Sequence, residues 1–229
     1  MATKPAGTAD PLRVALEQGS KRVFAAALNW PGWCRSGKTA ELALEALADY
    51  ASRYAPVAKH AGLSLPAGVA DRLDVVEQVP GDATTDFGAP GAITPSDHGH
   101  VTAAEAERMA ALVCAAWTVF DQVAAVSPEE LRKGPRGGGR DRTKMMAHVF
   151  DAEAGYARYL GLKPKPPGAD NPAAVAEQRA AIAAVLGRAW DGGPYSERKS
   201  WPPRYAARRI GWHVLDHAWE MEDRSTPQA

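Results

Sequence analysis

The second half of the chain repeats apolar residues every three or four positions, which is the period of an amphipathic α-helix. Four such stretches are visible, at residues 102 to about 126, 140–160, 171 to about 190, and about 203 to 223. The first begins with a capping-box pattern, Thr102 followed by Glu105, and the third with Asn171 before a proline. Four helices of this length predict an up-down four-helix bundle, in which facing helices build a site between them.

In the first hundred residues the pattern of apolar residues differs and predicts strands as well as a helix. Residues 12–17 and 22–28 read as two short strands joined at Gly19-Ser20, where Gly19 would supply the positive φ of a tight hairpin. The segment 31–38 reads as a loop, residues 39–62 as a helix capped by Thr39 and stopped by Gly62, and residues 71–81 as a third strand. This order predicts a small β-β-α-β module.

Glycine and proline recur at short intervals in residues 82–99, as in a loop. The predicted organisation is therefore an α/β module at 1–81, a linker at 82–100 and a helical bundle at 101–229, which is an α+β fold. His98 and His100, at the end of the linker, are expected to be surface residues.

Gly32 to Thr39 matches the phosphate-loop pattern G-x-x-x-x-G-K-[ST] letter for letter. Nucleotide binding is nevertheless disfavoured, because the strand–helix alternation stops near Gly81 and no apolar run ending in aspartate follows to hold magnesium. The bulk of Trp33 also opposes the tight wrapping that phosphate requires.

The composition of the chain argues against some classes of binding partner. The 229 residues contain 27 Lys plus Arg and 27 Asp plus Glu, so the formal charge is zero, which argues against a chain-wide nucleic-acid or membrane-surface role. No apolar run approaches the roughly 18 residues that span a bilayer, and the N-terminus lacks a signal-peptide core. Cys34 and Cys114 are far apart, which fits a reduced compartment. We therefore expect a cytoplasmic protein, and the Ala, Arg and Gly enrichment hints at a bacterial source.

Histidines interrupt two of the apolar stripes. On the last helix His213 and His217 lie four residues apart, so both imidazoles reach one point. On the second helix His148 lies in the stripe with Met145 and Tyr156. Three inward imidazoles with one open position are typical of a reactive metal site. The alternative is a set of core histidines bonded to backbone or carboxylate.

Nearby charged residues supply further candidates. Asp151, Asp216 and Glu220 are expected to accept hydrogen bonds from the free ring N–H groups, and Glu220 is alternatively a fourth ligand. Residues 131–144 hold six cations in a Gly-rich turn. This turn reads as a solvated loop, as a nucleic-acid phosphate patch, or as a clamp for the carboxylates of an anionic thiol or substrate, formed by Arg136, Arg140 and Arg142.

One histidine on the second helix and His-x-x-x-His on the fourth resemble the DinB-like superfamily, which includes mycothiol-dependent maleylpyruvate isomerases and thiol S-transferases. The resemblance covers residues 100–224 and implies that His148, His213 and His217 bind zinc or nickel and that a low-molecular-weight thiol binds at the open site. Residues 12–60, with a strand, a Pro-Gly turn and an Ala/Leu-rich helix, resemble HicB-like antitoxin domains, which implies a toxin-binding or RNA-binding-like scaffold. A packing or dimerisation module is the alternative there, so a homodimer is among the expected assemblies.

These expectations favour an enzyme in which a metal activates a thiol or water toward an electrophilic small molecule. The alternatives are a protein that sequesters a metal or small ligand, or one that recruits a protein partner through the HicB-like half. A third alternative is a vestigial site whose histidines bond internally.

Overall fold

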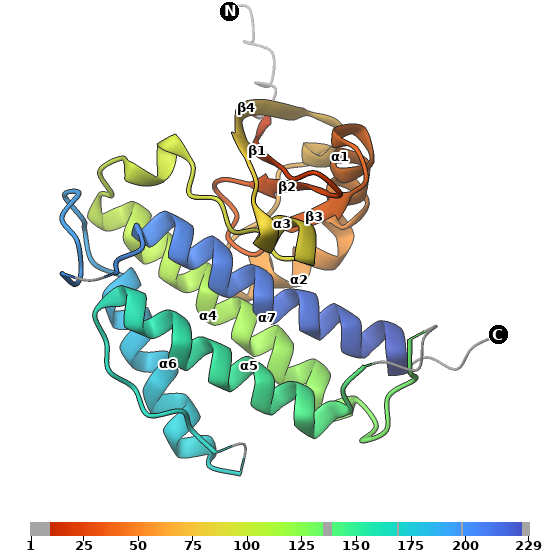
Figure 1. Ribbon diagram of the computed structural model, residues 1–229, viewed down its shortest axis with the longest axis vertical. Coiled ribbons are helices and arrows are strands. Elements are labelled where there is room, and N and C mark those ends of the chain that lie inside the picture. The colour runs from red at the N-terminus through yellow and green to blue at the C-terminus, as the bar shows by residue number, and fades with distance from the viewer. Residues whose placement is uncertain (1–9, 135–138, 169, 198, 226–229) are drawn as a thin grey trace, which may run out of the picture. The chain divides into compact units, whose positions relative to one another are not determined.

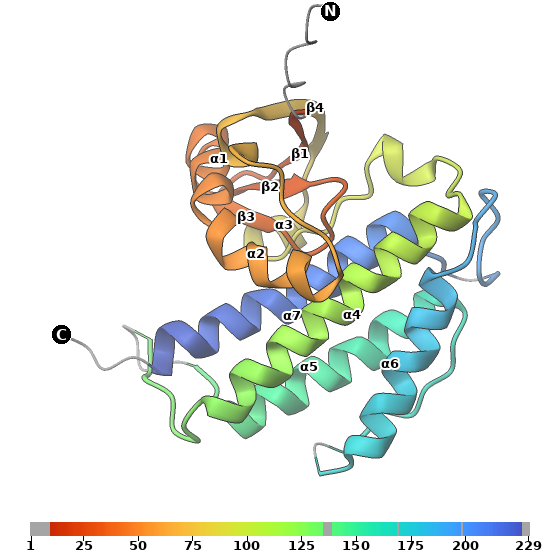
Figure 2. The same ribbon diagram turned by 180° about the vertical axis from the view of Figure 1, so that it is seen from behind.

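The computed structural model describes residues 10–134, 139–168, 170–197 and 199–225 and shows a mixed α+β chain (Figures 1 and 2). These residues contain four β-strands and seven α-helices. The chain divides into two compact units. The first comprises residues up to Asn29 together with Cys34–Ala92, and the second comprises Trp30–Trp33 together with the chain from Ile93 onward.

The first unit is built on one sheet with the order β3-β2-β1-β4. β1 pairs antiparallel with β2 and parallel with β4. The central strand β1 buries four consecutive residues from Val14 to Glu17, whereas the edge strand β4 alternates between half-buried and exposed positions. Consecutive buried residues show that both faces of this central strand are covered. The strands are β1 (Leu12–Gln18), β2 (Val23–Ala27), β3 (Cys34–Gly37) and β4 (Leu73–Pro80).

Two helices follow the first three strands, α1 (Ala40–Asp49) and α2 (Ala51–His60), and α1 packs on β2 and β3. The Thr39 hydroxyl accepts a hydrogen bond from the Leu42 amide, so the predicted cap is confirmed. The single helix predicted for residues 39–62 is wrong, because Tyr50 ends α1.

Two further sequence predictions fail in this unit. The segment predicted as a loop contains β3, so the order begins β-β-β-α-α-β rather than β-β-α-β. Gly19 does not have a positive φ. A glycine at this position is explained instead by the close approach of Asp86, since an added Cβ would lie 2.4 Å from its Oδ1. That carboxylate accepts hydrogen bonds from the Ser20 hydroxyl at 2.5 Å and the Lys21 amide at 2.8 Å.

The stretch expected as a linker contains the short helix α3 (Ala83–Phe87) and a 3₁₀ turn, Pro95–His98. The buried Glu17 carboxylate accepts hydrogen bonds from the amides of Gly91 and Ala92 at 2.9 and 3.0 Å. Glu17 thereby ties this stretch to β1, and the first unit extends to Ala92.

The second unit contains four longer helices close to the predicted ranges: α4 (Ala103–Val126), α5 (Arg142–Ala157), α6 (Pro172–Leu186) and α7 (Pro203–Ser225). The predicted capping box is confirmed. The Thr102 hydroxyl accepts from the Glu105 amide at 3.3 Å, and the Glu105 carboxylate accepts from the Thr102 amide at 2.9 Å. The Asn171 side chain caps α6 by accepting from the Ala174 amide at 3.0 Å.

The directions of these helices differ from the predicted up-down order. α4 and α7 run the same way, because Arg204 of α7 bonds Glu105 near the start of both helices, at 3.1 Å, and the chain just after α4 bonds Arg224 near the end of α7. α5 and α6 both run against α4, which gives an up-down-down-up order. After α5 the chain returns beside α6 before that helix starts (Figure 1).

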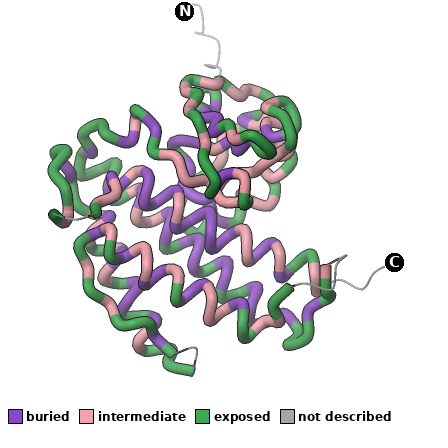
Figure 3. Tube along the Cα trace, viewed as in Figure 1, coloured by how far each residue is buried: buried purple, intermediate pink, exposed green. Residues whose placement is uncertain are grey.

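The core of this unit follows the helix interfaces, and buried residues run along α4 and α7 (Figure 3). Among the described residues, one helix, α4, is long and apolar enough to cross a membrane by length and composition alone. This corrects the expectation that no segment reaches that length. However, 56% of its most apolar window is buried in the structure, as in the core helix of a globular unit.

Candidate metal centre

Three histidines from two helices converge in the second unit. His148 comes from α5, and His213 and His217 come from successive turns of α7, and one ring nitrogen of each lies within 4.8 Å of the others. The Nε2 atoms of His148 and His213 are 3.2 Å apart. Two nitrogens on one tetrahedral zinc ion, each at about 2.0–2.1 Å, would be about 3.3 Å apart. The donor set therefore fits one divalent ion after a small approach of the third ring.

The convergence follows from local sequence. The i,i+4 spacing places both imidazoles of α7 on one face. Met145 and Val149, which flank His148 on α5, are fully buried, as are Ile210 and Val214 on α7. Packing of these apolar side chains turns all three rings into the interface between α5 and α7.

Two of the three rings, those of His148 and His213, are shifted toward the neutral form that metal ligation requires. Burial lowers the pKa of His213 well below its ordinary value, and the nearby His217 and His148 lower it further. Burial also lowers the pKa of His148, with contributions from Arg140 and His217. The imidazoles of His148 and His213 therefore face each other in the neutral form at neutral pH.

His213 lacks the partner that a core histidine would have. Its Nδ1 is buried and has no hydrogen-bond partner among the described residues, while its Nε2 lies 3.2 Å from Nε2 of His148. An unsatisfied buried polar atom costs about 1–3 kcal/mol. His213 is therefore not a core histidine bonded to backbone or carboxylate among the described residues.

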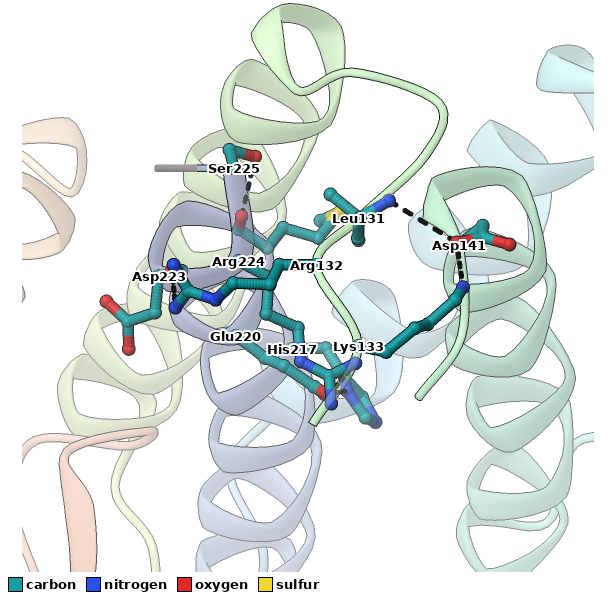
Figure 4. A network of polar contacts seen from close by, with 10 residues as sticks. Leu131, Arg132, Lys133, Asp141, His217, Glu220, Asp223, Arg224 and Ser225 are labelled. Carbon is teal, nitrogen blue, oxygen red and sulfur yellow. Dashed lines mark hydrogen bonds and ion pairs between the residues drawn. The ribbon is translucent and has the colours of Figure 1, made fainter. Parts of the chain in front are cut away.

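Glu220 orients the third ring (Figure 4). Its Oε2 lies 2.9 Å from Nδ1 of His217, and its Oε1 lies 3.0 Å from a guanidinium nitrogen of Arg224. The hydrogen bond with His217 lowers the pKa of Glu220, so the carboxylate is ionised. A carboxylate on Nδ1 leaves Nε2 as the ligating atom, which is the usual carboxylate–histidine–metal arrangement. Of the other acidic candidates, Asp151 is exposed and raises the pKa of His148 through its charge, and Asp216 is half-buried.

The three arginines of the predicted clamp are not equivalent. Arg142 donates to the Ser127 carbonyl at 2.8 Å and pairs with Glu129 at 3.1 Å, so it holds the α4–α5 connection together. Arg140 is exposed, and its charge lowers the pKa of both His148 and His213. Arg136 lies outside the described residues. Of the two arginines that are described, Arg140 is the one whose charge acts on the histidines.

Two further cations of the basic turn, Arg132 and Lys133, make contacts within the chain. Arg132 donates to the Asp223 carbonyl at 2.8 Å, and Lys133 pairs with Asp141 at the start of α5 (Figure 4). These contacts fix the turn to the ends of α5 and α7.

Sequence reasoning did not assign two residues beside the histidines. The Tyr156 ring lies edge-on to His213, with centroids 5.7 Å apart, and the Arg209 guanidinium lies 5.5 Å from the Tyr156 ring. Helical spacing could have identified both residues from the sequence, because Tyr156 is two turns after His148 and Arg209 is one turn before His213. Together they close one side of the cluster.

The phosphate-loop pattern has structural explanations. Residues 34–37 form an extended strand, which cannot wrap round phosphate. Gly32 has a φ of +93°, and an added Cβ would lie 2.7 Å from Cδ1 of Leu215 and 3.0 Å from the Gly211 backbone. Gly32 is therefore required for backbone approach to α7.

No family model, no curated protein and no solved structure matches this chain.

Proposed function

We propose that α4, α5, α6 and α7 form a four-helix bundle that holds one zinc or nickel ion on His148, His213 and His217. The single observation that carries this proposal is the convergence of three ring nitrogens within 4.8 Å. Two observations support it. The low pKa of His213 keeps that imidazole neutral and able to bind metal, and the ionised Glu220 orients the His217 ring and makes it a more basic ligand.

Three protein ligands leave a further coordination position for substrate or water. When bound, the metal would lower the pKa of a thiol or water and so provide a nucleophile near neutral pH. The residues around the histidines would orient the ligands and position the substrate. Glu220 would keep the proton on Nδ1 of His217, and Tyr156 would exclude water beside His213. Arg140 would add positive charge that favours an anionic thiolate.

We further propose that the reaction is transfer of a low-molecular-weight thiol, or of water, to an electrophilic small molecule. The choice of thiol over water rests on the DinB-like resemblance of the ligand spacing. Small-molecule partners are favoured over nucleic acid, because Arg132, Lys133 and Arg142 of the basic turn are engaged in contacts within the chain.

The test uses the full chain without a polyhistidine tag. The protein is stripped with a chelator and reloaded with zinc or nickel, and transfer of N-acetylcysteine to monochlorobimane, with loss of chloride, is followed by fluorescence. We expect turnover only in the reloaded protein, loss in His213→Ala, and no change in His98→Ala, whose side chain is exposed. Equal turnover with and without metal would contradict the proposal. One bound metal without turnover for any thiol or for water would favour sequestration instead.

A further inference from the structure

One face of α5 carries a glycine at a position where no close contact from the described residues excludes a larger side chain. Gly155 lies inside the helix without a positive φ, and an added Cβ would meet no described atom within 4 Å. Apart from proline, glycine is the residue that least favours a helix interior. Packing within the described chain therefore does not explain this glycine, and what it leaves is open space.

That space is part of a recess of about 420 Å³. Its lining has two cationic side chains and no acidic one, and consists of Ala152, Gly155, Tyr156, Arg158, Tyr159 and Lys199. A concave surface with one sign of charge attracts ligands of the opposite sign. The charge of the lining therefore selects an anion.

Aromatic rings give the recess a flat and fixed wall. Trp201 stacks on Tyr159 with centroids 4.2 Å apart and an interplanar angle of 9°. The Trp201 amide donates to the Tyr159 carbonyl at 3.0 Å, which holds the stack in place. The Lys199 ammonium lies 5.9 Å from the Tyr159 ring centroid. A flat ring beside a cation suits a ligand with a planar body and a negative group.

We infer that this recess binds a small aromatic anion, with its ring against Tyr159 and its carboxylate between Arg158 and Lys199. The site is separate from the metal ligands, although Tyr156 lines the recess and also contacts His213. Nothing in this inference requires a bound metal.

The first test compares three probes of similar size on the metal-free full chain by calorimetry and saturation-transfer NMR: naphthoate, naphthalenemethanol and naphthylmethylamine. We expect naphthoate to bind at least about tenfold more tightly than the alcohol, and the amine to bind most weakly. Lys199→Gln should weaken naphthoate binding about tenfold and leave the alcohol unchanged. Lys59→Gln, an exposed lysine of the first unit, is the matched control and should change neither. Equal affinity for the anion and the alcohol would overturn the inference.

A second variant tests the location. Gly155→Leu fills the recess and should abolish naphthoate binding, while the melting temperature stays equal or rises, because leucine favours a helix more than glycine. Retained naphthoate binding in Gly155→Leu would also overturn the inference. The metal content of this variant reads out the metal centre independently, so failure of the recess and failure of the metal site are distinguishable.

Discussion

His217 and Glu220 show how a single side-chain contact prepares a ligand. The carboxylate on Nδ1 selects the tautomer that leaves Nε2 free, and the pair with Arg224 holds the carboxylate in place. Both contacts lie within α7, so they form whenever this helix forms. The proposed metal centre would therefore be partly organised before any ion binds.

We expect Glu220→Gln to weaken zinc affinity about tenfold or more, because loss of an outer carboxylate reduces the basicity and order of the ligand. Competition with a chromophoric chelator measures the affinity. Glu107→Gln, an exposed glutamate of α4, is the control. Unchanged affinity in Glu220→Gln would mean that the carboxylate does not support the ligand.

At the residue scale, helical spacing alone predicted that His148, His213 and His217 would lie together, because each occupies an apolar stripe. The roles of the arginines were not predictable in this way. Arg140 and Arg142 are two positions apart, and their environments differ because the α4–α5 connection supplies partners for Arg142 alone, at Ser127 and Glu129.

At the element scale, a buried ion-pair network joins three helices. Arg179 of α6 bonds Glu153 of α5 at 3.1 Å and Asp121 of α4 at 2.9 Å, and Glu153 is fully buried. Burial raises the pKa of Glu153, and the guanidinium opposes that rise. Removing Arg179 would leave the buried Glu153 carboxylate uncompensated, whereas Arg179 would keep Asp121 if Glu153 were removed.

We therefore expect Arg179→Ala to lower the free energy of unfolding by about 3–5 kcal/mol, because it leaves the buried Glu153 carboxylate unpaired. Glu177→Ala, an exposed position of α6, should stay within about 0.5 kcal/mol of the parent. Urea unfolding of the two variants measures the difference. Equal stability of the two would show that the network contributes nothing net.

The cap of α4 makes a pH-dependent contribution. The backbone hydrogen bond from Thr102, together with Arg204, lowers the pKa of Glu105 from 4.5 to about 2. Because the unfolded chain binds the proton more readily, stability rises with pH in this window. We expect the stability difference between the parent and Glu105→Gln to be complete above about pH 5 and to vanish as the pH falls toward 2. Acid titration of unfolding checks this, and a difference that is constant with pH would contradict it.

The positions of the long helices were predictable, because caps at Thr102 and Asn171 and the apolar period mark them independently. Their directions were not, because the connection from residue 161 to 171 permits either a turn or a return along α5. The strand β3 was missed because it has only four residues, Cys34–Gly37, and includes an arginine and a serine.

For the molecule as a whole, the assignment of Trp30–Trp33 to the second unit is the main feature that sequence order conceals. The segment is flanked by strands of the first unit, yet Trp30 lies under Arg108 of α4 at 4.4 Å and Gly32 packs on α7. Sequence reasoning placed a single boundary, and tertiary packing divides the chain differently.

We expect Gly32→Ala to destabilise the protein by at least about 2 kcal/mol, from a strained backbone and a clash with Leu215. Gly62→Ala is the matched control, since its φ is also positive, at +71°, but its Cβ would meet nothing within 4 Å. It should cost about 1–2 kcal/mol from backbone strain alone. Thermal unfolding measures both, and an equal loss in the two would show that close packing at Gly32 is unimportant.

The measurement that tests the central claim most directly is the zinc stoichiometry of the untagged full chain. It is determined by elemental analysis after equilibration and gel filtration, beside His148→Ala, His213→Ala and His217→Ala. We predict about one zinc per chain in the parent, and loss in each of the three variants, because each removes one of three protein ligands. Retention of zinc in all three variants, or no zinc in the parent, would contradict the metal centre.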